Sequence, residues 1–245
     1  MLTSDRGQFP VMFSLLHAAE RLFANFSVHG DPVFYERDRF PWTQQLERGW
    51  EAMREECERV MQRRELIPNF QDISPEQSAI TRDDKWKTYV LYAYGVKARH
   101  NCAACPNTTA VIEQIPGMKT ALFSILSGPK HIPLHRGPYK GLLRCHVGLL
   151  IPGQPGACRI RVAGTERHWQ EGGVLIFDDT FPHEVWNDTT EDRIVLFLDI
   201  VRPMRFPLSV LNDWILRLIV HSPYGRSTIR RFARWYELRG IKADV

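Results

Sequence analysis

Long apolar runs are absent from this sequence of 245 residues. The apolar stretch near the N-terminus is short, is interrupted by His17 and Glu20, and precedes no small-residue cleavage site, so we expect no secretory signal. The longest later run, residues 207–220, is interrupted by Asn212, Asp213 and Arg217. A spanning helix needs about 20 mostly apolar residues, so this run is poorly suited to cross a bilayer.

The sequence contains few cysteines, and their C-x-x-C motif occurs once. There are five cysteines, an odd number, and Cys102 and Cys105 form a single C-x-x-C without a second pair or a neighbouring histidine cluster. A structural zinc site needs four ligands, so this motif does not predict one. We expect a reducing compartment and a cytoplasmic location. Two buried thiols are the simpler interpretation of the pair, and a redox role or a disulfide stays open.

The chain also lacks internal repeats, low-complexity tracts and any recognisable nucleic-acid-binding motif. With 44% hydrophobic and 24% charged residues its composition is that of a globular protein, and we expect a single domain over residues 1–245 that binds no nucleic acid.

Positive charge is concentrated at the C-terminus. Residues 202–245 contain nine Lys or Arg and three acidic residues, whereas the whole chain has a net charge of +4. Within the segment 206–242, apolar residues recur at helical spacing, which predicts a basic amphipathic helical segment. Such a helix either packs on the domain or makes peripheral contact with the inner face of a membrane, and the sequence leaves both open.

The first half of the chain is partly helical. Apolar residues from Trp42 to Met61 step by three or four and predict one amphipathic helix after Pro41. Residues 67–84 have the composition of an ordered loop, residues 86–95 that of a strand, and a short helix is expected over 108–115.

After Thr120 the pattern changes to short strands separated by Gly, Pro, Asp and Asn. The strand-like runs are TALFSIL, GLLRCHVGLLI, CRIRV, GVLIFDD and RIVLFLDIV. Strands without intervening helices argue against a parallel α/β fold. We therefore predict a mainly β protein with flanking helices (α+β), whose core is a double-stranded β-helix, a cupin-like jelly roll.

Charged residues interrupt two of these strands. Alternation places Arg144 and His146 on one face of one strand, and Arg193 enters the last strand beside apolar neighbours. A buried guanidinium requires an anionic partner. Either these arginines pair with Asp178, Asp179 or Asp199, or they line a pocket for a dicarboxylate.

Two histidines flank the same strands. His135 precedes the Arg144 strand, and His183 lies in the turn expected after GVLIFDD. Imidazole at a strand end can bind a first-row transition metal through one nitrogen while the other is held by a hydrogen bond. A single loop histidine is usually only a solvent-facing residue, so the order of the two histidines and Arg193 is what indicates a site.

Several blocks in the same order resemble the catalytic domain of the aspartyl/asparaginyl β-hydroxylase family. They are HRGPYKGLLRCHVGLLIP, CRIRV, GGVLIFDDTFPHEVWNDT and RIVLFLDIVRP, and the resemblance covers about residues 86–203, the expected dioxygenase β-core. The family also contains bacterial enzymes that hydroxylate acyl chains of lipid A and of ornithine lipids.

The resemblance implies an Fe(II)- and 2-oxoglutarate-dependent dioxygenase that uses O2 to hydroxylate an unactivated C–H bond. It implies that His135 and His183 hold the iron and act as the catalytic residues, and that Arg193 binds the distal carboxylate of 2-oxoglutarate. Ser124, Arg144 and His146 would complete the cosubstrate site. Many related dioxygenases add a carboxylate ligand two residues after the first histidine, where this chain has Gly137, as the hydroxylase family does.

The substrate is left open between a peptide or protein and a lipid. The catalytic domain favours an Asp/Asn hydroxylase, whereas the basic C-terminal segment suits a lipid acyl-chain hydroxylase acting at a membrane surface. Asp178 and Asp179 are expected either to support His183 or simply to form a turn. An alternative from another class is a cupin module that binds ligands without turnover.

Overall fold

The computed structural model describes residues 20–240. Its α-helices are α2 (Glu20–Phe26), α3 (Thr43–Met61), α4 (Phe70–Ile73), α5 (Arg99–Ala104), α6 (Pro106–Ile112), α7 (Leu208–His221) and α8 (Pro223–Glu237). Its strands are β1 (Phe34–Tyr35), β2 (Trp86–Ala93), β3 (Val96–Lys97), β4 (Met118–Ser127), β5 (Lys130–His135), β6 (Leu142–Leu150), β7 (Cys158–Val162), β8 (Thr165–His168), β9 (Val174–Phe177), β10 (His183–Asn187) and β11 (Asp192–Val201). Short 3-10 helices cover Arg37–Arg39, Arg64–Leu66 and Pro75–Ala79.

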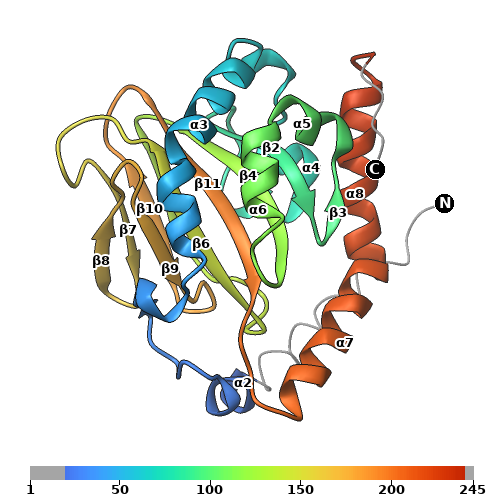
Figure 1. The fold of residues 1–245 in the computed structure, drawn as a ribbon. Coiled ribbons are helices and arrows are strands. Elements are labelled where there is room, and N and C mark those ends of the chain that lie inside the picture. Colours follow the sequence, from blue (N-terminus) through green and yellow to red (C-terminus); the bar gives the residue numbers. More distant parts are fainter. Residues whose placement is uncertain (1–19, 241–245) are drawn as a thin grey trace.

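The strands form two antiparallel sheets in jelly-roll order. The large sheet has the order β1-β9-β6-β11-β4-β2-β3, and the small sheet has the order β5-β10-β7-β8. From β4 to β11 the chain passes back and forth between the sheets, so β4, β6, β9 and β11 face β5, β7, β8 and β10 across the core (Figure 1). This is the connectivity of a double-stranded β-helix, and it confirms the predicted fold class.

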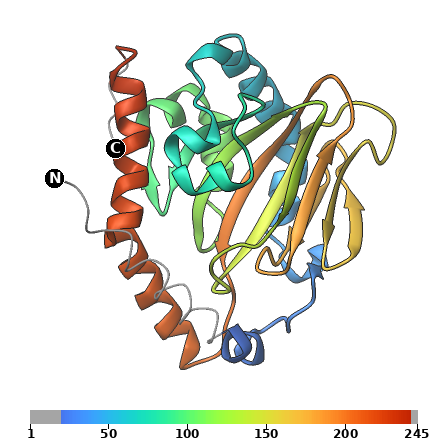
Figure 2. The ribbon, with the colours of Figure 1, turned by 180° about the vertical axis from the view of Figure 1, so that it is seen from behind.

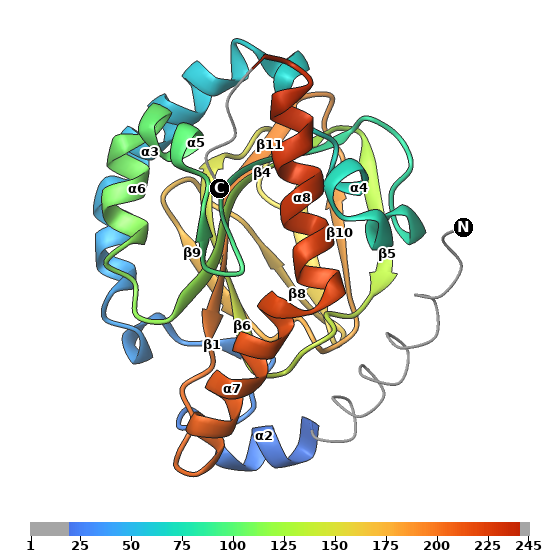
Figure 3. The same cartoon turned by 90° about the vertical axis from the view of Figure 1, so that its right-hand side faces the viewer.

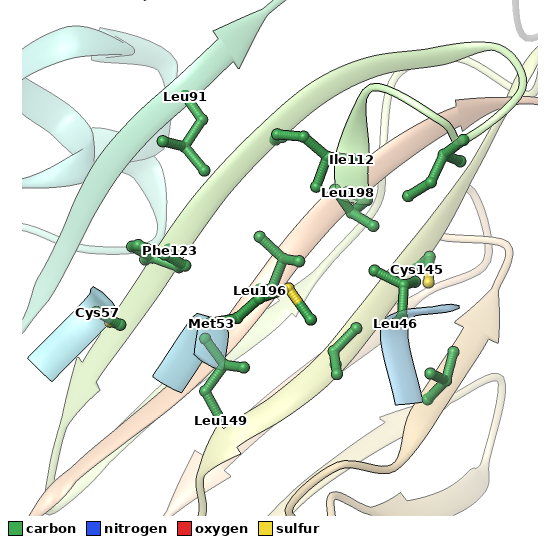
Figure 4. Close-up of a cluster of buried hydrophobic side chains, with 14 of the residues drawn as sticks. Leu46, Met53, Cys57, Leu91, Ile112, Phe123, Cys145, Leu149, Leu196 and Leu198 are labelled. Atoms are coloured by element: carbon green, nitrogen blue, oxygen red, sulfur yellow. The ribbon is translucent and has the colours of Figure 1, made fainter. Parts of the chain in front are cut away.

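Helix α3, the amphipathic helix predicted after Pro41, covers the outer face of the large sheet. Its side chains Leu46, Met53 and Cys57 lie against the sheet residues Leu196 and Leu149 (Figure 4). Leu46 and Met53 are completely buried, and burying a side chain of this size stabilises a fold by about 1.5–3 kcal/mol. The apolar face of α3 and the outward-facing apolar residues of the large sheet therefore form one buried layer.

The inner face of the large sheet packs on the small sheet. Phe177, Val195 and Leu126 meet Ile160 and Val185 in a second buried cluster. The same alternation that turns these apolar residues inward also turns Arg144, His146 and Arg193 inward. The polar residues therefore lie inside the roll, where water has little access.

The C-terminal segment forms two helices, which we call the C-terminal arm (α7 and α8). The break between them falls at Ser222, whose hydroxyl accepts a hydrogen bond from the backbone N–H of Gly225. The arm runs along one side of the molecule, with β7 and β8 on the opposite side (Figures 1 and 2). Residues 241 and 242 of the predicted segment lie outside the described residues. Within residues 20–240, none of the helices has both the length and the apolar character to span a membrane.

Several short elements were not expected from the sequence. Helix α4 lies inside the predicted loop, α5 precedes the predicted short helix, and β5, β8 and β10 were not recognised as strands. All five cysteines are free and buried, as expected for two simple thiols at Cys102 and Cys105. Burial raises the pKa of Cys105 to about 12, which keeps this thiol protonated at neutral pH.

Candidate functional site

His135 and His183 are brought together by strand pairing. His135 ends β5 and His183 begins β10, and the antiparallel register places the two residues directly opposite each other. Their ring centroids are 4.1 Å apart. The expectation of a turn at His183 was wrong, because the residue belongs to a short strand that pairs on both sides with β5 and β7.

Both imidazoles are held in the same way. The Nδ1 atom of His135 is 2.8 Å from the carbonyl oxygen of Pro133, and Nδ1 of His183 is 3.0 Å from that of Phe181. A carbonyl oxygen can only accept, so each Nδ1 carries the proton and donates it. Each Nε2 atom therefore keeps a free lone pair, which is the state in which histidine binds a metal.

The same environment keeps both rings neutral. Burial is the main cause that lowers the pKa of His135 to about 4, and the neighbouring His183 lowers it further. Burial also lowers the pKa of His183 to about 4, with the Arg144 guanidinium contributing. At pH 7 both imidazoles are thus neutral without help from a bound metal.

Arg193 lies at the start of β11 and is buried without a carboxylate partner among the described residues. Its side chain is 2% exposed, its Nε has no hydrogen-bond partner, and its guanidinium carbon lies 4.7 Å from the ring centre of Trp169. Burial lowers the pKa of Arg193 to about 10, so it remains charged at neutral pH. An uncompensated buried guanidinium is costly and indicates that an anion belongs there.

His146 is a second buried polar side chain without partners. Neither ring nitrogen has a hydrogen-bond partner, although the residue is only 6% exposed. Phe177 and Phe197 pack against the ring, and burial lowers its pKa well below the usual value. Ser124 lies on β4, which β11 separates from the His146 strand β6, and its hydroxyl accepts a hydrogen bond of 3.0 Å from Trp86. That hydroxyl proton remains available to a ligand.

Arg144 differs from Arg193, because two carboxylates already bind it. Its guanidinium forms ion pairs of 2.9 Å with Asp179 and with Asp199, and it lies 4.1 Å above the ring of Phe197. The alternative of an arginine matched by aspartates therefore applies to Arg144. It does not apply to Arg193.

The two adjacent aspartates have separate contacts. Asp178 accepts hydrogen bonds from the backbone N–H and the hydroxyl of Thr180, and it also pairs with Lys140 at 2.9 Å. Asp179 turns toward the histidine pair, where its carboxylate fills the space beside Gly137. A Cβ at position 137 would lie 2.2 Å from an Asp179 oxygen. Position 137 therefore has room only for glycine while Asp179 stays in place.

These residues surround one cavity of about 320 Å³. Its wall includes all six residues singled out in the sequence: Ser124, His135, Arg144, His146, His183 and Arg193. A second cavity of about 150 Å³ adjoins it and shares Arg144, Asp179 and Phe197 with it. Within residues 20–240, no third His, Cys, Asp or Glu joins the histidine pair as a metal ligand.

Two tryptophans that contact residues of this cavity carried no signal in the sequence. Trp169 lies between β8 and β9 and packs over Arg193, and Trp86 orients Ser124. Each is a single tryptophan outside any motif, and only the folded arrangement connects it with the charged residues.

Comparison with known proteins identifies relatives of the whole chain and of its core. A model of the family described as aspartyl/asparaginyl beta-hydroxylase matches residues 47–203. The chain is 41% identical over 222 residues to an ornithine lipid ester-linked acyl 2-hydroxylase of Rhizobium tropici, covering 91% of this chain and 79% of that protein. It is 34% identical over 167 residues to the aspartyl/asparaginyl beta-hydroxylase of Mus musculus, covering 66% of this chain but only 22% of the mouse protein.

Likeness to solved structures is much weaker. The cupin domain of a transcriptional regulator from Enterobacter cloacae superposes with a TM-score of 0.33 at 12% identity, covering 47% of this chain and 96% of that one. The fold assignment therefore rests on the strand order. The family assignment rests on the match to residues 47–203 and on the relative that spans most of the chain: the protein belongs to the aspartyl/asparaginyl β-hydroxylase family.

Proposed function

We propose that the protein is an Fe(II)- and 2-oxoglutarate-dependent hydroxylase. The observation that carries the proposal is the pair of Nδ1-anchored, neutral imidazoles of His135 and His183, which share a cavity with the unpaired guanidinium of Arg193. The first two residues offer nitrogen ligands to iron. The third offers a bidentate fork to a carboxylate.

The polar groups without partners fit the proposed cosubstrate. Buried polar atoms are nearly always hydrogen-bonded, so the orphaned nitrogens of His146 and Arg193 indicate a polar ligand between them. We assign the distal carboxylate of 2-oxoglutarate to Arg193, with Ser124 and His146 as further contacts. Arg144 forms part of the wall and fixes Asp179, because its own charge is already matched.

Bound iron and 2-oxoglutarate would supply the oxidising power needed to place an oxygen atom from O2 into a C–H bond. The chain itself contributes three things. It keeps both imidazoles neutral by burying them, it orients the cosubstrate through Arg193, and it excludes water by the aromatic rings of Phe177, Phe197 and Trp169.

For the substrate we propose the acyl chain of a lipid such as an ornithine lipid. The relative that acts on such a lipid matches about nine-tenths of this chain, so the match must extend beyond the β-core, whereas the mouse hydroxylase matches two-thirds of it at lower identity. An Asp or Asn side chain remains the second candidate because the family model bears that description. A cytoplasmic enzyme working at the inner face of the membrane is part of the lipid proposal.

Succinate formation tests the reaction. Purified protein with Fe(II), ascorbate, O2 and 2-oxoglutarate should form succinate, and His135→Ala, His183→Ala and Arg193→Ala should each lose it. Arg159→Ala is a matched control, because Arg159 pairs with Asp188 at the surface. Wild-type protein that binds iron and 2-oxoglutarate without turnover would instead support a non-catalytic cupin module. Stimulation of succinate formation by an ornithine lipid, and not by an Asp-containing peptide, would favour the lipid substrate.

A further inference from the structure

Helix α7 is apolar on two opposite faces. One face, with Leu208 and Leu216, is buried against Phe23, Tyr139 and Met204. The other face carries Val210, Leu211, Trp214 and Leu218, which we call the α7 stripe. Their spacing of one, four and eight residues places them on a single side of the helix. A surface helix normally presents polar residues on that side.

The α7 stripe is exposed to an unusual degree. Trp214 is 60% and Leu218 is 65% exposed, and Phe206, just before the helix, is 79% exposed. Of the nine large hydrophobic residues exposed among residues 20–240, five lie between Phe206 and Leu218. Scattered exposed leucines are ordinary, but a contiguous apolar patch with an aromatic anchor marks a binding surface.

Exposed arginines without carboxylate partners among the described residues lie on both helices of the C-terminal arm. Arg217 lies beside the stripe on α7, and α8 continues with Arg226, Arg230, Arg231 and Arg234, all exposed. Within the described part of the chain, none of these five forms an ion pair with an acidic residue. The only acidic residues on the two helices are Asp213 and Glu237. The exposed surface of the C-terminal arm is therefore apolar along α7 and positively charged along α8.

This combination matches an anionic lipid surface better than a second copy of the chain. Amphipathic helices that bind bilayers combine Trp, Phe and Leu with a basic polar face, and each basic residue near an anionic membrane adds to the attraction. A symmetric dimer through the same stripe would instead bring Arg217 and Arg226 of the two copies toward like charges.

The C-terminal arm also connects with the cavity beside the histidine pair. The hydroxyl of Tyr139 donates a hydrogen bond to Asn212 on the buried face of α7. Tyr139 and Thr228 of α8 both line the adjoining cavity of about 150 Å³. The arm and its position beside α4 are visible in Figure 3. A bilayer on the outer side of the arm would thus lie next to a helix that lines the adjoining cavity.

We propose that the α7 stripe and the exposed arginines of α7 and α8 dock the protein on an anionic phospholipid bilayer. The stripe enters the interface between headgroups and acyl chains, and the arginines bind lipid phosphates. This docking surface would bring the enzyme to the proposed lipid substrate, and its role in the reaction rests on that substrate. The binding itself needs neither iron nor 2-oxoglutarate.

Vesicle sedimentation of the full chain, without iron or 2-oxoglutarate, tests the proposal. Wild-type protein should sediment with vesicles of equal parts phosphatidylglycerol and phosphatidylcholine, and much less with pure phosphatidylcholine. Trp214→Glu/Leu218→Glu should lower the partition coefficient by about tenfold or more, as should Arg226→Glu/Arg230→Glu. Leu238→Glu is the matched control, because Leu238 is 72% exposed but follows the far end of α8, and its binding should not change.

All five substituted side chains are exposed, so the circular dichroism spectra and melting curves of the variants should match those of the wild type. Wild-type protein that ignores anionic vesicles, or a Trp214→Glu/Leu218→Glu variant that binds like wild type, would overturn the proposal. A wild-type dimer that this variant converts to a monomer, without loss of vesicle binding, would assign the stripe to a second copy. Vesicle binding without succinate formation would leave the docking surface intact and refute only the proposed reaction.

Discussion

At the scale of single residues, the decisive feature is how the two histidines are held. Each Nδ1 donates to a carbonyl oxygen two residues earlier in the chain, from Pro133 and from Phe181. This local bond fixes both tautomer and ring orientation before any metal binds. The site is thus preorganised by backbone geometry, and burial supplies the neutral charge state.

The buried imidazoles make stability depend on pH. The pKa values of His135 and His183 are lowered by burial to about 4, whereas an unfolded histidine has a pKa of about 6.5. Between these values the unfolded chain binds more protons, so the free energy of unfolding of metal-free protein should fall as the pH drops from about 6.5 to 4. The slope is at most about 1.4 kcal/mol per pH unit for each imidazole. Urea unfolding at several pH values measures it, and His183→Asn should flatten the dependence; an identical slope in that variant would contradict the argument.

Gly137 offers a test of the missing carboxylate. Gly137→Asp should fail to add a third ligand, because its Cβ would lie 2.2 Å from an Asp179 oxygen. We expect a loss of about 1–3 kcal/mol in the free energy of unfolding and weaker iron binding, measured by urea unfolding and by titration with Fe(II) under anaerobic conditions.

Two further variants complete the Gly137 test. Gly137→Asp/Asp179→Ala removes the colliding carboxylate and should regain part of the lost stability. Gly49→Ala is the control, because the nearest atom to its added Cβ is 3.4 Å away and alanine favours the helix. No recovery in the double variant would mean that the collision with Asp179 is not the cause.

At the scale of elements, α3 fixes α6 through one buried carboxylate. Glu56 is completely buried and accepts hydrogen bonds of 2.8 Å from the backbone N–H groups of Asn107 and Thr108, and another from the Thr108 hydroxyl. These N–H groups belong to the first turn of α6, where they have no partner within the helix. A carboxylate there also interacts favourably with the helix dipole.

Removing that carboxylate should therefore uncouple the two helices. Glu56→Ala should lower the free energy of unfolding by about 3 kcal/mol, because it leaves several buried donors without an acceptor. Glu58→Ala, two residues later on the exposed side with only Arg54 as partner, should cost less than about 0.5 kcal/mol. Equal losses in the two variants, measured by urea unfolding, would show that the cap is not the source of the stability.

At the scale of the whole molecule, one buried ion cluster joins segments distant in the sequence. Arg202, after β11, pairs with Asp178, after β9, and donates hydrogen bonds of 2.7 Å to the Lys140 carbonyl and to the Tyr35 hydroxyl. Lys140 in turn pairs with Asp31 at 2.8 Å. Asp178 begins the turn that leads to His183, so the cluster also positions the histidine side of the cavity.

Breaking this cluster on one side should be severe. Arg202→Met should lower the free energy of unfolding by about 3–5 kcal/mol, because Asp178 would stay buried with less compensation. The double variant Arg202→Met/Asp178→Asn should lose less than the sum of the two single losses, as a double-mutant cycle by urea unfolding can measure. Strict additivity would show that the two side chains do not stabilise each other.

Local periodicity alone predicted β2, β4, β6, β7, β9 and β11, helix α3 and the shared strand face of Arg144 and His146, whereas β5, β8 and β10 were not recognised. This periodicity is a property of the sequence and does not depend on tertiary contacts. The family resemblance also identified the six residues that line one cavity in the structure. Their roles as ligands of iron and 2-oxoglutarate remain predictions.

Which charges are matched depends on contacts between segments that are distant in the sequence. Arg144 and Arg193 look alike in sequence, yet Arg144 pairs with Asp179 and Asp199, whereas Arg193 packs on Trp169 and pairs with no carboxylate among the described residues. The short strands β5 and β10 likewise exist because each pairs with the other, which places His135 opposite His183. Pairing between distant segments leaves no periodic trace in either one. For this reason the sequence could name the residues of the site, whereas only the fold could show which of them still lack a partner.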